Sequence, residues 1–262
     1  MDLQIDGDAA LVTASSGGLG KAAAAALVAE GVDVVINGRD EQRLSAAATE
    51  LAAIGGGEVI AQPGDLREPE DIQLLVERTV DAYGGIDHLV TSAGGPPSGA
   101  FTDIPTEAWY DTYDLLVMSV VRLVHAAAPY LEDGGGTIVT ITSRSVKEAI
   151  DGLVLSNAVR MAVIGLEKTL STELAPAVRA NAVLPGPHET ARIRELIDQQ
   201  VDRGEVDSYE EGLAAWAEGV PVGHIGDADG LGATVAFLCS PHASYINGVA
   251  IPVDGGAGAS NL

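Results

Sequence analysis

The residues best suited to chemistry form a small-residue turn near the start of the chain, Thr13-Ala14-Ser15-Ser16-Gly17-Gly18-Leu19-Gly20. Two apolar residues, 11–12, precede it, and an alanine-rich stretch, 21–30, follows it. A strand, a glycine-rich turn and a helix in this order point unpaired backbone N–H groups at an anion. Gly18 and Gly20 let a phosphate approach the backbone without meeting a Cβ atom. The turn therefore predicts a phosphate-binding site, and the alternative is a packed strand-to-helix turn without a ligand.

Apolar runs alternate with helical patterns along the whole chain, and these elements must position the turn. We expect strands at Ala9–Val12, Val32–Asn37, Glu58–Gln62, Asp87–Thr91, Gly136–Thr142, Ala180–Leu184 and Val249–Val253. We expect helices at Lys21–Glu30, Glu41–Ile54, Pro69–Tyr83, Trp109–Tyr130, Leu155–Leu174 and Ala228–Cys239. This alternation predicts an α/β fold, a Rossmann-type doubly wound parallel sheet in three layers, as a single domain over residues 1–262. A mostly polar, helical excursion at about 190–223 is expected to form a lid.

The charge balance excludes several kinds of partner. The chain has 38 acidic and 14 basic residues, for a formal net charge of −24. Such a surface repels nucleic acid and anionic membranes, so neither is expected as a partner. The acids are spread along the chain, which favours adaptation to high salt, as in a halophile, over an acidic docking face.

Hydrophobic runs, the N-terminus and the cysteine count indicate where the protein is located and whether it binds a metal. No uninterrupted apolar run reaches about 18 residues, so no transmembrane helix is expected. The acidic N-terminus is unlike a signal peptide, which makes a cytoplasmic location the expectation. Cys239 is the sole cysteine, so an intramolecular disulfide and a cysteine-based metal site are excluded and no metal is predicted.

Ligands of doubly wound sheets bind beyond the carboxyl ends of the strands, and short motifs follow the strands in this chain. The motifs are Thr13–Gly20, Asp65-Leu66, Thr91-Ser92-Ala93-Gly94, Pro185-Gly186 with Thr190, and Val253-Asp254-Gly255-Gly256. With these motifs the chain resembles the short-chain dehydrogenases/reductases, close to their carbonyl- and beta-ketoacyl-reductase branch, with Ala14 in place of the first glycine of TGxxxGxG. The resemblance covers nearly the whole chain and implies a bound nicotinamide dinucleotide. The residues implied to hold it are Thr13, Ser15, Ser16, Gly18, Leu19, Gly20, Asp65, Leu66, Ala93, Gly94, Asn157, Pro185, Gly186 and Thr190.

The resemblance also implies a homo-oligomer. In the family, the helices that correspond to 109–130 and 155–174 pair across a two-fold axis. A dimer or tetramer is therefore expected.

The end of the second strand favours NADP over NAD. NAD enzymes usually have an acid there, which accepts hydrogen bonds from the ribose hydroxyls. This chain has Gly38 followed by Arg39. With no acid to repel it, a 2′-phosphate can pair with the guanidinium. We predict NADP as the cofactor, with Arg39 binding its phosphate. The alternatives are NAD, and an Arg39 that pairs with Asp40 or Glu41 instead.

The catalytic motif departs from the family's pattern. The resemblance implies a serine that steadies the substrate carbonyl, and Ser143 matches it. It also implies a tyrosine that passes a proton and a lysine four residues on that lowers the tyrosine pKa. Leu153 and Asn157 stand in those two positions, and Leu116 replaces an asparagine that holds a water. Certain divergent, reductase-like members of the family carry the same leucine–serine–asparagine stretch. Because leucine cannot give or take a proton, another acid would be needed.

Other polar residues offer weaker candidates for that acid: Tyr110, Tyr113, Arg144, Lys147 and His188. For His188 we favour a solvated loop histidine, for Lys147 a surface cation and for Tyr113 a packing role. Ser143 is the one catalytic residue that we predict, and its alternative role is a loop cap. Asn157 either caps the following helix or hydrogen-bonds the nicotinamide ribose.

Two functions remain open from the sequence. The first is an NADP-dependent oxidoreductase acting on a small-molecule carbonyl or hydroxyl substrate, resembling a 3-oxoacyl-(acyl carrier protein) reductase. The alternative is a nucleotide-binding protein that has lost ketone reduction and has a regulatory or assembly role.

Overall fold

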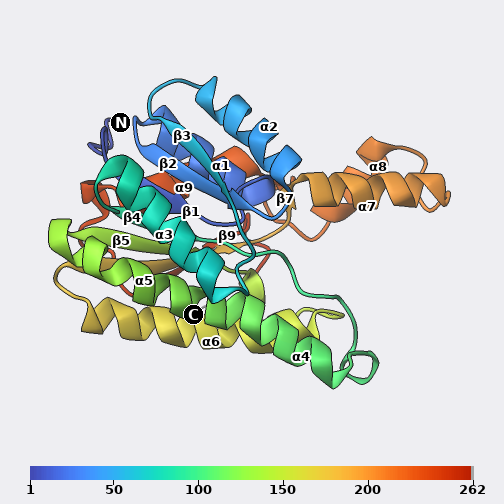
Figure 1. The fold of residues 1–262 in the computed structure, drawn as a ribbon. Helices are drawn as coiled ribbons and strands as arrows, with labels where there is room; N and C mark the ends of the chain where they lie inside the picture. Colours follow the sequence, from blue (N-terminus) through green and yellow to red (C-terminus); the bar gives the residue numbers. More distant parts are fainter. Residues whose placement is uncertain (261–262) are drawn as a thin grey trace.

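The computed structural model describes residues 1–260, except for the side chains at positions 192, 196 and 199, and its centre is a parallel sheet (Figure 1). The sheet has seven strands in the order β3-β2-β1-β4-β5-β6-β9. The strands are β1 (Ala9–Val12), β2 (Asp33–Gly38), β3 (Val59–Pro63), β4 (His88–Thr91), β5 (Gly136–Ile141), β6 (Val178–Pro185) and β9 (Ala250–Val253). The order reverses between β1 and β4, so a crevice opens at their carboxyl ends. The α/β, doubly wound fold predicted from the sequence is confirmed.

Helices cover both faces of the sheet. They are α1 (Gly18–Ala29), α2 (Glu41–Ala52), α3 (Pro69–Tyr83), α4 (Thr106–Tyr113), α5 (Ser119–Gly134), α6 (Val154–Glu173) and α9 (Ala228–Cys239). One buried apolar cluster joins α1, α2 and α9 to the sheet, and a second joins α3, α5 and α6 to it. Consecutive strand residues point to opposite faces, so Val12 belongs to the first cluster and Leu11 to the second. This two-sided burial explains why the strands are continuous apolar runs.

Helices α1 and α9 touch through their backbones. A Cβ atom on Gly232 of α9 would lie 2.3 Å from the carbonyl oxygen of Ala22 in α1. Only a glycine allows this approach without displacing a helix. The contact fixes the axis of α1 and therefore the direction of its first turn.

The helix expected at Trp109–Tyr130 is longer than predicted and is not uniform. It runs through α4, a π-helical turn at Asp114–Met118 and α5, over residues 106–134. By length and composition alone this helix could cross a membrane, since an 18-residue window of it has a mean hydropathy of 1.4, but a core helix passes the same test. Leu123, Ala127 and Leu131 of α5 are buried in the second cluster. The helix is therefore part of the layer that α3, α5 and α6 form on one face of the sheet.

Two helices, α7 (Ala191–Asp202) and α8 (Tyr209–Ala217), project from the body as an arm over residues 188–227 (Figure 1). Ile193, Ile197 and Ile225 form a small buried cluster of the arm's own. A two-stranded sheet, β7 (His188–Glu189) with β8 (Gly226–Asp227), forms its base. The arm is therefore held together largely by its own contacts.

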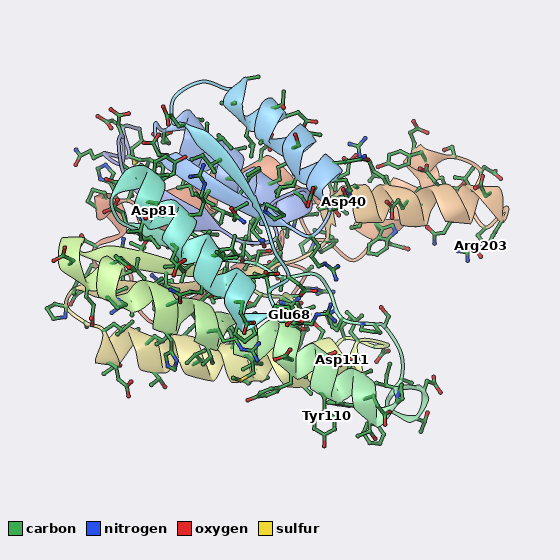
Figure 2. All side chains as sticks on the ribbon, viewed as in Figure 1. Asp40, Glu68, Asp81, Tyr110, Asp111 and Arg203 are labelled. Carbon is green, nitrogen blue, oxygen red and sulfur yellow. The ribbon has the colours of Figure 1, made fainter. Side chains whose placement is uncertain are left out.

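Acidic side chains are spread over different elements of the surface. Asp40, Glu68, Asp81 and Asp111 lie exposed at the start of α2, before α3, in α3 and in α4 (Figure 2). Within the part of the chain that the structure describes, no group of three or more His, Cys, Asp or Glu residues is placed to hold a metal ion. These four acids therefore lie on separate elements and do not form one patch.

Candidate functional site

A cleft of about 570 Å³ opens at the carboxyl ends of the strands. It extends from Arg39 and Asp65, beyond β2 and β3, across the first turn of α1, to Ser92 and Thr142, beyond β4 and β5. The residues that line it are Ala14, Ser16–Gly20, Asn37–Arg39, Arg43, Gly64–Leu66, Ser92–Gly95, Leu115, Ile141, Thr142, Arg160, Thr190 and Ala191. The volume suits a ligand of nucleotide size.

The turn before α1 presents its backbone to the cleft. No side chain caps α1, and the N–H groups of Gly18, Leu19 and Gly20 have no intrahelical partner. A Cβ atom on Gly17 would have no atom within 4 Å, and one on Gly18 would have only Thr190 Cγ2, at 4.0 Å. The space in front of the turn is therefore open. An anion placed there meets free N–H donors and the positive end of the helix dipole.

Gly20 has a different role, because the turn packs against it. Its Cβ atom would lie 2.5 Å from the carbonyl oxygen of Ala14 and 3.1 Å from that of Thr13. Ala14 itself adopts a φ of 46°, in the left-handed region that favours glycine. This is the position where the family pattern has its first glycine, so the backbone keeps the shape that the motif predicts although the side chain differs.

Thr13 and Ser15 hold the turn in place but do not line the cleft. Thr13 Oγ1 donates to the carbonyl oxygen of Ser92 at 2.8 Å and accepts from the Ser92 N–H at 2.9 Å. Ser15 Oγ donates to the carbonyl oxygen of Val12 at 2.6 Å and accepts from the Asn37 N–H at 3.0 Å. Both side chains are fully buried. The sequence motif marked them as ligands of a dinucleotide, whereas the structure uses their hydroxyls to join β1 to β4 and β2.

Two guanidinium groups lie at the β2 end of the cleft. Arg39 and Arg43 are exposed, line the cleft, and form no ion pair with a described residue. The alternative pairing of Arg39 with Asp40 or Glu41 is absent from the described residues, and Asp40 instead caps α2 by accepting from the Arg43 N–H at 3.0 Å. Asp65 pairs with Arg67 at 2.6 Å, and this hydrogen bond lowers the pKa of its carboxyl group. Arg39 also attracts the Asp65 carboxylate, but neither Arg39 nor Arg43 forms an ion pair with a described residue, so this end of the cleft is suitable for a phosphate.

The residues at the family's catalytic positions do not line the cleft themselves. Ser143 follows β5, and its Oγ accepts from the Ser145 N–H at 3.1 Å, the loop cap that the sequence left as an alternative. Asn157 lies inside α6, so it does not cap the helix. Its amide oxygen accepts from the Ile150 N–H at 3.1 Å, and its amide nitrogen donates to the Ile150 carbonyl at 2.9 Å. Each end of the amide therefore makes one hydrogen bond to the preceding loop, which orients the side chain toward Ile150. The second amide N–H makes no hydrogen bond to the described residues, and the predicted contact with a ribose stays a prediction.

The residues predicted after β6 have two different roles: some line the cleft and others pack against neighbouring backbone. Thr190 and Ala191, at the base of the arm, line the cleft, whereas Pro185 and Gly186 do not. A Cβ atom on Gly186 would lie 2.7 Å from Asp254 Cα, so this glycine is needed for backbone packing. His188 is 5% exposed, and its Nδ1 is 3.0 Å from the Gly186 carbonyl oxygen. The interpretation of His188 as a solvated loop histidine is wrong.

The other candidate acids are placed away from the lining. Arg144 pairs with Glu148 at 2.7 Å and donates to the carbonyl oxygen of Ala257 at 2.9 Å. Tyr110 and Tyr113 are exposed on α4, and Figure 2 shows Tyr110 on the outer surface of that helix. None of these side chains, nor Lys147, lines the cleft.

The structure brings to the cleft a charged side chain that no sequence motif marks, Arg160 of α6. It is 8% exposed, and its Nε atom is buried without a hydrogen-bond partner. Burial lowers its pKa to about 10, so it stays charged at neutral pH. A cavity of about 10 Å³, the size of one water, shares Arg160, Ser92 and Thr142 with the cleft. The sequence could have indicated Arg160 in one way: it is a charged residue on the face of α6 that packs against the fold, where apolar residues are expected.

Glu167 lies two turns further along α6 and is fully buried. Thr140 of β5 donates to its Oε1 atom, and Thr91 donates to Thr140 at 2.7 Å. Its Oε2 atom is buried without a partner. Burial raises the pKa of the carboxyl group to about 8, against the opposing effect of the Thr140 hydrogen bond. Glu167 is therefore mostly protonated at neutral pH.

Comparison with known proteins gives consistent matches over the whole chain. The family described as enoyl-(acyl carrier protein) reductase matches residues 13–258. Dehydrogenase/reductase SDR family member 4 from Homo sapiens is 34% identical over 253 residues, covering 94% of this chain and 86% of that protein. L-sorbose reductase from Gluconobacter frateurii, complexed with NADPH and L-sorbose, has a TM-score of 0.95 at 30% identity, covering 99% of this chain and 100% of that one. An actinorhodin polyketide ketoreductase with NADPH has a TM-score of 0.88 at 32% identity, covering 96% and 97%.

Proposed function

Because the chain belongs to the short-chain dehydrogenase/reductase family, we propose that it is an NADP-dependent oxidoreductase that acts on a small carbonyl or hydroxyl compound. The cleft carries this proposal, since it combines an open glycine turn with two unpaired arginines at one end. The NADPH complexes of the sorbose reductase and the polyketide ketoreductase support the choice of nucleotide.

The residues of the cleft fit the parts of such a nucleotide. The N–H groups at the start of α1 would hold the pyrophosphate, and Arg39 with Arg43 would hold the 2′-phosphate. Asp65 and Leu66 border the adenine end. Ala93, Gly94, Thr142 and Thr190 border the other end. When bound, the reduced nicotinamide supplies a hydride.

Ser143 is the residue that we propose to orient the substrate. Its Oγ accepts one hydrogen bond, from the Ser145 N–H, so its own hydrogen is free to be donated to a substrate oxygen. Leu153 and Asn157, in place of the family's tyrosine and lysine, supply no proton. General acid catalysis contributes about two to four powers of ten, so we expect slow turnover compared with relatives that have the pair.

The same two residues favour the alternative function. A protein that binds NADPH but lacks a proton donor fits a regulatory or assembly role. Titration with NADPH in molar KCl, followed by turnover assays across ketones, keto sugars and alcohols, separates the two. Binding with turnover supports the oxidoreductase, binding without turnover in every class supports the alternative, and an absence of binding rules out both.

Substitution of Arg39 by alanine is expected to weaken NADPH binding selectively. Loss of a charge-assisted hydrogen bond to the 2′-phosphate should lower the affinity for NADPH by roughly 10- to 100-fold and leave that for NADH within about twofold. Fluorescence titration with both nucleotides measures this, with Arg78→Ala on the exposed face of α3 as the control. An equal loss for NADH and NADPH would contradict the assignment.

Replacing Gly38 by an acid would not simply convert the cleft to NAD binding. The Cβ atom of the new residue would lie 2.9 Å from Ser16 Cβ, so the backbone or Ser16 would have to shift.

High salt is proposed as the working condition of this chain. With a net charge of −24 spread over the surface, repulsion destabilises the compact state in dilute buffer. We expect the thermal midpoint to rise between ~0.1 M and ~2 M KCl, where the Debye length falls from about 10 Å to below about 3 Å. A midpoint that stays constant over this range would show that the acids have no such role.

We also propose a homo-oligomer. Exposed Tyr110, Tyr113 and Tyr130 of the α4–α5 helix and Met161 of α6 give the two long helices apolar groups on their outer surfaces. Light scattering in molar KCl gives the mass, and a monomer at micromolar concentration would count against this proposal.

A further inference from the structure

Arg160 lies at the opposite end of the cleft from Arg39 and Arg43. The β2 end holds the two exposed arginines, the turn of α1 lies between, and Arg160 comes next to Ser92, Ile141 and Thr142. On the proposed function, the β2 end takes the phosphorylated ribose. The other end, with Arg160, then takes the nicotinamide and its sugar.

Arg179, a second arginine that is at least half-buried, has the hydrogen bonds expected of a structural residue, and Arg160 does not. Arg179 is half-buried, and its guanidinium donates to the carbonyl oxygens of Leu238 at 2.8 Å, Ser240 at 3.1 Å and Ile246 at 3.3 Å. Arg160 is more deeply buried and has no hydrogen bond or ion pair with any residue from 1 to 260 that the structure describes. A desolvated cation without partners is strongly unfavourable. Its position in the cleft indicates that a ligand supplies the missing oxygen atoms.

Among the residues that the structure describes, the small cavity beside Arg160 is lined by no other titratable side chain. The residues that share its two cavities on β4, β5 and the α4–α5 helix are polar but uncharged, or apolar: Thr91, Ser92, Thr140, Thr142, Ser119 and Leu116 are examples. On its own helix, Glu167 is held by Thr140, and burial alone accounts for the lowered pKa of Arg160. The field at this end of the cleft is therefore that of one uncompensated positive charge.

We propose that Arg160 makes the inner end of the cleft selective for the reduced nicotinamide nucleotide. Its guanidinium donates to the sugar hydroxyls beside the ring, which bind the reduced and oxidised forms alike. Its charge acts differently on the two forms, because the oxidised ring carries a positive charge and the reduced ring is neutral. By Coulomb's law, two like charges roughly 5–10 Å apart at an effective dielectric constant near 20 repel each other by an energy that corresponds to a factor of roughly 10 or more in affinity. The site therefore favours NADPH over NADP⁺, and with it carbonyl reduction over alcohol oxidation.

The test measures the two affinities rather than turnover, and it rests on the proposed function. NADPH and NADP⁺ are titrated by calorimetry in molar KCl against the wild-type protein, Arg160→Met and the exposed control Arg78→Met. The wild type and the control should prefer NADPH by about 10-fold or more, and Arg160→Met should reduce that preference by about 10-fold or more. Equal losses of both affinities in Arg160→Met, or an unchanged preference, would overturn the proposal. A wild type that binds neither nucleotide would instead overturn the proposed function.

A second variant, Arg160→Lys, decides the matter even where the methionine variant fails to fold. A buried lysine has a pKa below its ordinary value, so it loses its charge within an accessible pH range, whereas arginine keeps it. The preference for NADPH should therefore persist in Arg160→Lys at low pH and fall as the pH rises. The pH dependence of the wild-type preference is measured in parallel. It includes any effect of Glu167 titration and should be weaker than that of Arg160→Lys. A preference in Arg160→Lys that rises with pH, or that is lost at every pH while NADPH still binds, would contradict a charge effect.

Discussion

Gly20→Val is expected to abolish measurable nucleotide binding and to lower the free energy of unfolding by roughly 1–3 kcal/mol. The Cβ atom would lie 2.5 Å from the carbonyl oxygen of Ala14 and 3.1 Å from that of Thr13, so it meets backbone on both sides. Neither carbonyl can move without displacing the turn, because Thr13 is tied to Ser92 by two hydrogen bonds. The N–H groups at the start of α1 would then point away from the phosphate position. Calorimetric titration with NADPH and urea unfolding, both in molar KCl, measure the two effects.

The matched control is Gly17→Ala, three residues earlier in the same turn. Gly17 has an extended backbone, with φ 179°, that any residue adopts, and its Cβ atom would have no protein atom within 4 Å. This variant should keep the stability of the wild type and lose affinity only as far as the methyl group meets the ligand. Gly20→Val with normal affinity, or Gly17→Ala with the larger loss of stability, would show that the turn is not positioned as described.

Glu167→Gln is expected to become steadily more stable than the wild type as the pH rises from about 5 to about 8. Below pH ~4.5 the native and unfolded states both hold the proton. Between that pH and the native pKa of about 8, the native state keeps the proton and the unfolded state loses it. The native state then binds more protons than the unfolded state, so stability falls as the pH rises, in total by an amount on the order of 4 kcal/mol. Glutamine has no proton to lose, so the variant does not show this decline.

Urea unfolding of the two proteins across this pH range measures the difference. Glu173→Gln, an exposed substitution at the end of the same helix, is the control and should follow the wild-type curve. An offset between Glu167→Gln and the wild type that stays the same at every pH would mean that Glu167 titrates alike in the native and unfolded states. That outcome would contradict the burial of its carboxyl group.

The nucleotide end of the site is predictable from the sequence because it depends on backbone. Parallel strands end at one edge of the sheet, so the residues after β1, β2, β3 and β4 meet there whatever their side chains are. A glycine turn also has few possible shapes, and Ala14 adopts the left-handed conformation of the glycine that it replaces. Ser16, Gly18, Leu19, Gly20, Arg39, Asp65, Leu66, Ala93, Gly94 and Thr190 accordingly line the cleft.

The other predicted residues depend on the direction of single side chains, which motifs do not specify. Asn157 occupies the helical position of a functional lysine, yet its short amide closes on the backbone of Ile150 instead of reaching the cleft. Arg160, nearly one turn later, has the length to reach it, but it stands outside the motif. Thr13 and Ser15 have hydroxyls that serve either a ligand or a neighbouring strand equally well. The three-dimensional contacts alone distinguish these uses.

The arm has a consequence beyond the site itself. Its isoleucine cluster is packed within the arm, and Gly212 of α8 comes so close to α7 that a Cβ atom would lie 2.5 Å from Ile197 Cγ2. The arm also contacts the body, since the Val222 N–H donates to the Gly255 carbonyl oxygen at 3.2 Å. Of the arm residues whose side chains the structure describes, Thr190 and Ala191 at its root line the cleft. Because its buried cluster is separate from the two clusters of the sheet, the arm is a unit that can open locally while the sheet stays folded.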